Sequence, residues 1–455
     1  MLVSACAGSG SANANREKST AYITMPDKSA LLQPVLLTSN FATTHVQLSI
    51  NTGSTYQEMD GFGFTLTGGS ALHISKMSSE ARAKLLKEIF GDGPQDIGVS
   101  FIRVSVGASD LDELLFSYND LPAGQTDPNI EKFDLGYDKK YLIPVLKQIL
   151  AINPNIKLLA SPWSPPVWMK DNGDTRGGSL KPEYYPSYAK YLVKYIQEMK
   201  KEGINIYALT IQNEPLHPGN NPSLLMPADA QKVFVRDHLG AAFSKNNIQT
   251  RIIIYDHNAD RPDYPISILN DPQAAKYIDG SAFHLYGGKV SAISEVHNAH
   301  PDKNLYFTEQ WVGAPGDFAK EMTWHTENLI IGAPRNWCKT VLEWNLAADN
   351  AQEPHTDRGG CKGCLGAVTI TGDAYTREPA YYIIAQASKF VPAGSVRVES
   401  NLPQDLPNVA YKIPDGKTVA IIQNTSESEK SVDVTDGTKK TTLTLKAGGI
   451  ATLVL

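Results

Sequence analysis

Apolar and polar positions alternate in two distinct ways along the chain. From Asp60 to about Ala348, short apolar runs rich in β-branched and aromatic residues are followed by polar loops and then by amphipathic stretches. This order is typical of β/α units around a parallel sheet. Eight apolar runs are found at residues 61–66, 99–106, 156–160, 207–212, 251–256, 281–286, 304–308 and 340–344. Helices are predicted between them, for example at 78–90, 141–152, 184–202 and 228–243. Eight strands with interposed helices in roughly 290 residues favour an α/β fold with a closed (β/α)8 barrel, a TIM barrel, over an open sheet.

The chain after Lys389 has a different pattern. Short runs that alternate apolar and polar residues are separated by turns, at 396–398, 409–413, 418–423, 430–434, 441–445 and 451–455. The pairs Asp415-Gly416 and Asp436-Gly437 are hairpin signals, so this part is predicted to be an antiparallel β domain. Residues 46–50 alternate in the same way before the barrel, and we expect this strand to join the same domain.

These patterns divide the chain into four parts. We expect residues 1–21 to form a leader, 22–57 to supply strands to a side β-sandwich, 58–388 to form the barrel, and 389–455 to complete the sandwich. Long low-complexity linkers are absent from the sequence, so the barrel and the β domain are predicted to share a packed interface.

Composition and charge exclude several classes of protein. The 455 residues contain 42 Lys and Arg against 48 Asp and Glu, and a net charge of −6 does not favour nucleic acid as a partner. A hydrophobic content of 42% with 20% charged residues is that of a globular protein. Uninterrupted apolar runs do not reach the roughly 18 to 20 residues that a membrane-spanning helix needs. We therefore expect a monomer that contacts a membrane only through a lipid anchor.

That anchor is predicted at the start of the chain. Residues 1–15 are small and polar after Cys6, which favours a flexible tether. Val3-Ser4-Ala5-Cys6 resembles the end of a bacterial lipoprotein signal, in which the cysteine is lipidated; a chance tetrapeptide is the alternative. The expected location is the bacterial cell surface or the periplasm, with anchoring at Cys6.

The other cysteines are too few for a four-cysteine zinc site. Cys361 and Cys364 are close enough for a redox pair or half of a metal site, but a small structural disulfide that pins a loop is favoured. Cys338 lies in an apolar run and is predicted to be a buried thiol.

Two glutamates carry the predicted chemistry. Active sites of such barrels lie at the carboxyl ends of the strands. Glu214 follows the fourth predicted strand and Glu309 follows the seventh, so each is expected at the barrel mouth. Two facing carboxylates in a pocket walled by aromatic rings suit acid-assisted cleavage of a glycosidic bond. A single such glutamate is more often a solvated or ion-paired rim residue, but two in equivalent positions favour catalysis.

The same strand ends supply further polar and aromatic side chains. These are Arg103, Asp110, Trp163, Trp168, Asn213, Asp256, His257, His284, Tyr286, Trp311, Trp344 and Asn345. Flat sugar faces stack on aromatic rings, and Trp163 in a proline-rich loop is the best candidate for such a platform. A metal-dependent hydrolase would need converging His and carboxylate ligands, and the first strand offers no H-x-H, so we expect no metal and no cofactor. A non-catalytic carbohydrate-binding protein would keep the aromatic residues but would not need both glutamates.

Several motifs in fixed order resemble a known family. They are Asp60-Gly61-Phe62-Gly63, the stretch S-P-W-S-P-P-V-W-M-K at 161–170, Gln212-Asn213-Glu214-Pro215, His284-Leu285-Tyr286 and Thr308-Glu309. From about Thr55 to its end, the chain resembles glycoside hydrolase family 30, which contains glucosylceramidases and β-1,6-glucanases. The resemblance implies a (β/α)8 barrel fused to a β-sandwich built from both ends of the chain.

The resemblance also implies roles for individual residues. Glu214 would be the general acid/base and Glu309 the nucleophile of a retaining β-glycoside hydrolase. The sugar subsite would be lined by Arg103, Asp110, Trp163, Asn213, His284, Tyr286 and Trp344, with Trp168 and Trp311 as further candidates. We expect Arg103 and Tyr286 to hold Glu309 ionised and Glu214 to keep its proton.

The loops at 170–180 and 360–370 look most similar to bacterial β-1,6-glucanases, so endo cleavage of a β-1,6-glucan is the favoured activity. Glucosylceramidase, or another β-glucosidase or β-xylosidase activity, is the alternative.

Overall fold

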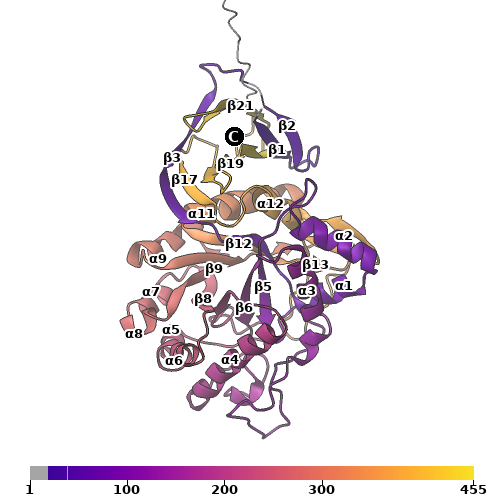
Figure 1. The fold of residues 1–455 in the computed structure, drawn as a ribbon, viewed down its shortest axis with the longest axis vertical. Helices are drawn as coiled ribbons and strands as arrows, with labels where there is room; N and C mark the ends of the chain where they lie inside the picture. The colour runs from indigo at the N-terminus through magenta and orange to yellow at the C-terminus, as the bar shows by residue number, and fades with distance from the viewer. Residues whose placement is uncertain (1–18, 38) are drawn as a thin grey trace, which may run out of the picture.

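A computed structural model describes residues 19–37 and 39–455. It shows a barrel with a smaller β domain stacked on one of its sides (Figure 1). Cys6 lies outside the described residues, so the lipid anchor stays a prediction. Of the helices in the described ranges, none combines the length and the apolar character that crossing a membrane requires.

Eight parallel strands close the barrel in the order β10-β12-β4-β5-β6-β7-β8-β9. Their bounds are β4 (Gly61–Thr65), β5 (Phe101–Val106), β6 (Lys157–Pro162), β7 (Ala208–Thr210), β8 (Arg251–Ala259), β9 (Ile278–Gly288), β10 (Asn304–Glu309) and β12 (Cys338–Asn345). All eight predicted strands are therefore confirmed. A cluster of buried side chains from seven of the eight strands, including Phe101, Leu159, Ile253 and Tyr306, fills the barrel interior.

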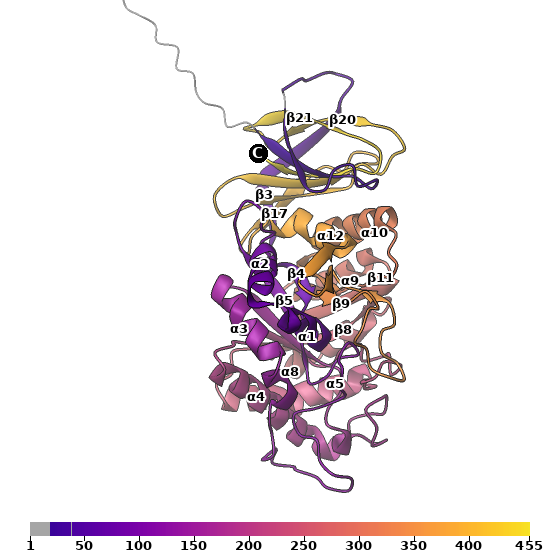
Figure 2. The ribbon, with the colours of Figure 1, turned by 90° about the vertical axis from the view of Figure 1, so that its right-hand side faces the viewer.

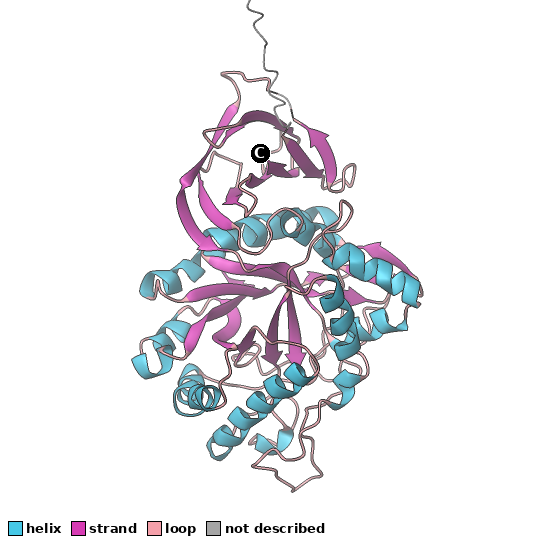
Figure 3. Cartoon of the chain, in the orientation of Figure 1, coloured by secondary structure: helices cyan, strands magenta, loops and turns pink. Residues whose placement is uncertain are grey.

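Helices surround this barrel, as Figure 3 shows. They are α1 (Gly68–Lys76), α2 (Ser79–Phe90), α3 (Leu142–Ile152), α4 (Tyr185–Lys201), α5 (Ala228–Phe234), α6 (Gly240–Lys245), α7 (Asp263–Leu269), α8 (Pro272–Ala275), α9 (Ile293–Ala299), α10 (Phe318–His325), α11 (Ala333–Arg335) and α12 (Pro379–Ser388). Short 3-10 turns are η1 (Gly136–Lys139), η2 (Val167–Met169), η3 (Pro182–Tyr184) and η5 (Val290–Ala292). The predicted helix at 228–243 is interrupted by a π-helical segment, η4 (Val235–Leu239), and a second one, η6 (Thr326–Gly332), follows α10. A π turn adds one residue to a turn of helix, which the apolar pattern does not reveal.

The β domain is a folded nine-stranded sheet in the order β2-β1-β22-β19-β18-β17-β3-β20-β21. Its strands are β1 (Thr20–Thr24), β2 (Gln33–Leu36), β3 (Val46–Glu58), β17 (Val396–Ser400), β18 (Asn408–Lys412), β19 (Thr418–Gln423), β20 (Lys430–Thr435), β21 (Lys440–Leu445) and β22 (Ile450–Val454). The strand expected at 46–50 does join this domain, and β1 begins at Thr20, inside the expected leader. The strands after Lys389 pair with one another in antiparallel fashion, as predicted, whereas β3 pairs with β20 in parallel. A strand from the far end of the chain is not joined to its partner by a hairpin, so no turn imposes the antiparallel direction.

The long strand β3 passes from one layer of this sandwich to the other, as Figure 2 shows in side view. Buried residues such as Leu48, Val398, Ile422 and Val434 fill the space between the layers. The outer face of the sheet packs on the barrel through α12, where Thr452 Oγ1 donates to the carbonyl oxygen of Gln386 at 2.6 Å. The two ends of the chain therefore form one domain that shares a buried interface with the barrel.

Short strands extend the barrel mouth. They are β11 (Val312–Gly313), β13 (Ala347–Ala348), β14 (Cys364–Leu365), β15 (Val368–Thr371) and β16 (Ala374–Arg377). Cys361 and Cys364 form the predicted disulfide, and Cys338 is a buried free thiol, as expected.

Candidate active site

The carboxyl ends of the barrel strands enclose a pocket of about 510 Å³. Its lining includes Asp110, Trp163, Asn213, Glu214, Leu216, His217, Asn220, His257, Asn258, Tyr286, Glu309, Trp311, Trp344, Gly359, Gly360, Cys361 and Cys364. Arg103 and His284 lie fully buried beneath this surface. The structure thus brings together the predicted site residues except Trp168 and Asn345; the Oδ1 of Asn345 instead accepts hydrogen bonds from Thr67 and Ser70.

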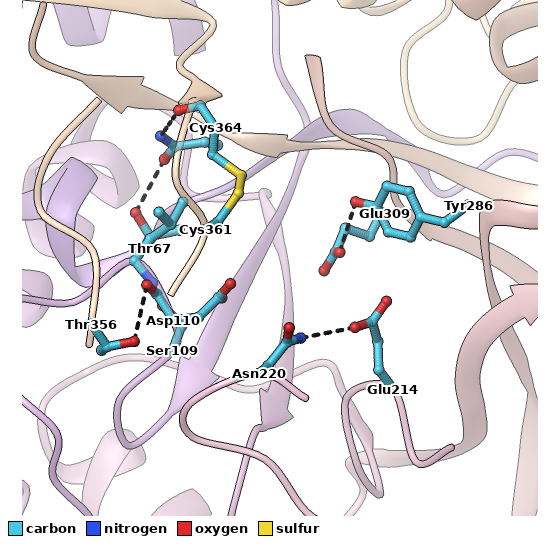
Figure 4. Close-up of a disulfide and its surroundings, with 12 residues drawn as sticks. Thr67, Ser109, Asp110, Glu214, Asn220, Tyr286, Glu309, Thr356, Cys361 and Cys364 are labelled. Carbon is cyan, nitrogen blue, oxygen red and sulfur yellow. Dashed lines mark hydrogen bonds between the residues drawn. A yellow bond between two sulfur atoms is a disulfide. The ribbon is translucent and has the colours of Figure 1, made fainter. Parts of the chain in front are cut away.

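Glu214 follows β7 and is turned towards the pocket by an uncommon backbone conformation. Its φ of 46° lies in the left-handed region, which costs a non-glycine residue of the order of 1 kcal/mol. The N–H of Glu214 donates to the carbonyl oxygen of Asp256 at 2.9 Å, which fixes this turn against the end of β8. Its carboxylate accepts a hydrogen bond from Asn220 Nδ2 at 2.9 Å (Figure 4).

Glu309 is the last residue of β10. The hydroxyl group of Tyr286 donates to its Oε1 at 3.0 Å, and Arg103 Nη1 donates to its Oε2 (Figure 4 shows the tyrosine contact). One carboxylate oxygen of Glu309, one of Glu214 and a ring nitrogen of His284 all lie within 4.8 Å of one another. This spacing is that of retaining glycosidases, whose carboxyl groups are ~5 to 5.5 Å apart, and is shorter than the ~6.5 to 9.5 Å of inverting ones.

Arg103 on β5 connects the strand ends. Its Nη2 donates to Asn213 Oδ1 at 2.6 Å and to Asp256 Oδ2 at 2.9 Å, and its Nε donates to Ser161 at 3.1 Å. The guanidinium group also stacks over Trp163, with 4.7 Å between the guanidinium carbon and the ring centroid. Five donors in a rigid fork allow arginine, unlike lysine, to hold several acceptors at once.

The buried polar groups of this network shift one another's pKa. Burial alone would lower the pKa of His284, but the charge on Glu309 and hydrogen bonds to Asp256 and Glu214 raise it to about 9. Burial would raise the pKa of Asp256, but Arg103 and His284 hold it well below its usual range. Arg103, His284 and Asp256 are therefore all charged at neutral pH.

The net charge of these three buried groups is positive, so it can balance one more negative charge. Arg103 and His284 carry two positive charges and Asp256 one negative charge, so a single ionised carboxylate makes the buried site neutral. Burial raises the pKa of Glu309, against the lowering effect of His284 and Arg103. Burial would also raise the pKa of Glu214, but the hydrogen bond with His284 lowers it. His284 Nδ1 lies 3.3 Å from Glu214 and 3.6 Å from Glu309, so the two carboxyl groups share this charged neighbour and their titrations are linked. Arg103 and Tyr286 contact Glu309 as expected, and the proton on Glu214 stays a prediction.

Asp110 and two tryptophans form the opposite part of the pocket. Burial and the charges on Glu309 and Glu214 raise the pKa of Asp110 well above its usual range, which favours its neutral form, a hydrogen-bond donor. Trp163 and Trp344 stack with ring centroids 5.4 Å apart. Such a surface suits a sugar ring, which has both apolar faces and hydroxyl groups.

The remaining aromatic candidates differ in position. Trp311 lies at the pocket mouth and is 36% exposed. Trp168 is not part of the pocket lining, because its indole N–H donates to Asn119 and its ring packs on Tyr184. The sequence interpretation that placed Trp168 in the sugar site is therefore corrected.

The sequence reasoning missed some pocket residues. Asn220 and His217 come from a loop without any apolar periodicity, so no local signal identified them, and Asn258 lies near the end of β8, two residues beyond the predicted strand. The loop at 359–364 was recognised for its cysteine pair but was not expected to line the pocket.

A cation could find ligand atoms at one place in the described part of the chain. Glu214, His284 and Glu309 present one ligand atom each within 4.8 Å. With its pKa raised to about 9, however, His284 keeps its proton at neutral pH, and only a neutral imidazole binds a metal. The positive charge of this site is supplied by Arg103 and His284 themselves.

Comparison with known families agrees with this geometry. Residues 59–391 match the glycosyl hydrolase family 30 TIM-barrel domain, and residues 394–453 match the beta sandwich domain of the same family. The chain belongs to glycoside hydrolase family 30. It is therefore a glycoside hydrolase, and the family resemblance seen in the sequence is confirmed.

Relatives of known activity lie in two groups within family 30. The chain is 33% identical to the endo-1,6-beta-D-glucanase neg1 of Aspergillus fumigatus, over 83% of this chain and 81% of that protein. It is 29% identical to the lysosomal acid glucosylceramidase of Mus musculus, over 88% of this chain and 81% of that protein. A solved structure of an endo-beta1,6-glucanase superposes with a TM-score of 0.89 and 34% identity, covering 96% of this chain and 99% of that one.

Proposed function

We propose that this protein is an endo-acting, retaining hydrolase of β-1,6-glucosidic bonds in β-glucan. The observation that carries the retaining mechanism is the distance of less than 4.8 Å between oxygens of Glu214 and Glu309. The substrate is inferred from relatives at 33% and 34% identity that are named endo-1,6-β-glucanases.

The reaction takes two displacements. Glu309 attacks the anomeric carbon, the glycosidic C–O bond breaks, and Glu214 gives its proton to the departing oxygen. A water molecule then attacks the glycosyl ester, Glu214 takes one proton from it, and Glu309 is released as a carboxylate. Glu214 is therefore the acid in the first step and the base in the second.

The productive protonation state needs a proton on Glu214 and a negative charge on Glu309. A sugar in the pocket displaces water from Glu214 and so favours its neutral form. Arg103 and Tyr286 stay hydrogen-bonded to Glu309 and hold the negative charge there. Substrate binding therefore favours the proton on Glu214 and the negative charge on Glu309.

Trp163, Trp344 and Asp110 form the side of the pocket that holds the sugar ring. Asn213 and His284 complete the subsite next to the carboxylates, and Trp311 lies at the mouth, where a leaving glucosyl unit would stack.

Variants of the two glutamates test the assignment of roles. Glu309→Gln should abolish turnover of every substrate, because the covalent intermediate cannot form. Glu214→Gln should lose about 10²- to 10⁴-fold on glucan. On a dinitrophenyl glucoside, whose leaving group needs no proton, it should keep most of kcat/KM, while kcat falls because attack by water on the glycosyl-enzyme lacks its base. Azide should restore turnover of the dinitrophenyl substrate by Glu214→Ala and give a β-glucosyl azide. Equal losses on both substrates, with no azide effect on either variant, would contradict these roles.

The substrate is tested by product analysis on a β-1,6-glucan such as pustulan, on xylan and on glucosylceramide. We expect short β-1,6-linked oligosaccharides from the first and an initial product of β configuration by NMR. Release of ceramide without cleavage of pustulan would favour the glucosylceramidase alternative, which the 29% identity to the mouse enzyme supports.

A further inference from the structure

The loop after β12 carries the Cys361–Cys364 disulfide and forms one side of the pocket. In Figure 4 the disulfide and Asp110 lie on one side of the open space, and Glu214 and Glu309 lie on the other. Cys364 is buried in a small cluster with Leu111, Trp163 and Trp344, and Cys361 is half-buried beside it. The sulfur atoms therefore belong to the wall that faces the two carboxylates.

The first half of this loop is held by contacts that do not involve the disulfide. The N–H of Thr356 donates to the carbonyl oxygen of Asp110 at 3.1 Å, and its hydroxyl group donates to the carbonyl oxygen of Asn221. Asn221 Nδ2 donates in return to the carbonyl oxygen of Asp357 at 2.9 Å. Gly359, at a φ of 144°, packs so closely that a Cβ atom there would clash with the carbonyl oxygen of Gly219. This half thus joins the loops that carry Asp110 and Glu214.

The second half is joined to the strand end that carries Glu309. Cys364 pairs with Gly313 in the β11–β14 ladder, just after Trp311, and Ala314 N–H donates to the carbonyl oxygen of Gly363 at 2.8 Å. Between the two halves, the turn at 361–363 has an exposed Lys362 and a Gly363 at a φ of 81°. The disulfide is the covalent bond that closes this turn and keeps Cys361 in the pocket wall.

The position of the wall determines which part of a sugar it meets. The anomeric carbon must lie at Glu309 for attack, so the ring atoms farthest from it, with their substituents, point towards the opposite wall. There the sugar meets two sulfur atoms, which are apolar and polarisable, beside Trp163, Trp344 and the polar Asp110.

We propose that the disulfide-closed turn at 361–364 is a specificity-determining wall that selects the glycosyl unit by the substituents farthest from the cleaved bond. This inference rests on the orientation of the sugar in the proposed function. A glucosyl unit fits against the closed turn, whereas a sugar with an inverted or missing substituent on that side loses contact with it. Opening the turn removes this selection without moving the carboxylates, because Glu309 lies on a barrel strand and Glu214 follows one.

The double variant Cys361→Ala/Cys364→Ala tests the proposal with aryl β-glucoside, β-galactoside and β-xyloside. We expect KM for the glucoside to rise by roughly 10-fold or more, as for lost contacts in a sugar-sized pocket. The change in kcat should be smaller, and the preference for glucoside over galactoside and xyloside should fall by a similar factor. Circular dichroism and the melting temperature establish that the variant is folded.

Reduction of the wild-type enzyme is a second arm that needs no variant to fold. Treatment with a phosphine reductant, which converts the disulfide into two thiols, should reproduce the rise in KM and should not affect the double variant. Cys338→Ala is the matched control, because this buried thiol on β12 lies outside the pocket lining; it should keep the wild-type KM and the response to the reductant.

Two results would overturn the proposal. One is an unchanged KM and an unchanged preference among sugars in both arms. The other is a fall in kcat with KM unchanged, which would show that the turn affects the reacting carboxylates and not the binding of the sugar. If the proposed substrate is wrong, the result is different: the wild-type enzyme would cleave the aryl glucoside but not the β-1,6-glucan. The effect of opening the turn on KM and on sugar preference could still be measured with the aryl glycosides.

Discussion

The buried ion pair between His325 and Glu343 should make the stability of this enzyme depend on pH in the alkaline range. Nδ1 of His325, at the end of α10, lies 2.6 Å from Oε1 of Glu343 on β12, and its Nε2 lies 3.0 Å from Glu321. Glu343 precedes Trp344 and Asn345, so the pair fixes the strand end that supplies the pocket wall. Burial alone would lower the pKa of His325, but the charge on Glu343 and the hydrogen bond to Glu321 raise it to about 9.

The magnitude follows from this pKa. An unfolded chain releases the proton at the ordinary value of about 6.5, and the difference from about 9 corresponds to roughly 3 kcal/mol of stabilisation. Because the folded-state pKa is raised, this stabilisation is complete below about pH 6.5, declines between about 6.5 and 9, and is absent above that range.

The perturbation is the double variant His325→Gln/Glu343→Gln, which removes the ion pair without leaving a buried carboxylate alone. We expect the free energy of unfolding of the wild type, relative to the variant, to be roughly 3 kcal/mol larger at about pH 6 than at about pH 9.5. Urea unfolding followed by tryptophan fluorescence measures it. His284 titrates in the same range in both proteins, so its contribution cancels in the difference. A difference between the two proteins that does not vary with pH would refute the reasoning.

Three other predictions address the site and the β domain. Exhaustive chelation with EDTA should leave the release of reducing sugar from glucan unchanged, because protonated His284 is not a metal ligand; a loss that a specific metal restores would contradict this. Arg103→Lys should lower kcat by about 10²-fold or more, since an ammonium group cannot contact Glu309, Asn213 and Asp256 together, and a variant with wild-type kcat would show that the fork is dispensable. Truncation after Val391 should give aggregated protein by size-exclusion chromatography, and the isolated tail should bind no glucan, because the one aromatic residue after that point, Tyr411, is fully buried; a soluble, active barrel would show that the two domains are independent.

Much of the fold could be predicted because the buried residues of each barrel strand are adjacent in the sequence. Barrel strands such as β8 and β12 are buried on both faces, so each appears as a continuous apolar run with polar residues at its carboxyl end. The same regularity located Glu214 and Glu309, since any residue that follows a barrel strand lies at the mouth.

Details that depend on the meeting of distant segments could not be predicted in this way. The parallel pairing of β3 with β20 joins residues almost 400 positions apart, and Trp168 turns away from the pocket because Asn119 accepts its N–H. The residues around β3 do not indicate that it pairs with β20, and the residues around Trp168 do not indicate that it bonds to Asn119.

The sequence by itself determined the strand count of the barrel, the two-domain organisation and the position of the two glutamates at the barrel mouth, because each depends on residue types at short, regular spacings. Only the tertiary structure decided how His284 lies between those carboxylates and what faces them across the pocket. The first depends on differences of a few tenths of an ångström between His284 and each glutamate. The second depends on a loop at 356–364 that packs against Asp110 and Asn221, more than 130 residues away in the chain. Electrostatic and packing energies vary with distance in space, and that distance is settled only when the barrel closes.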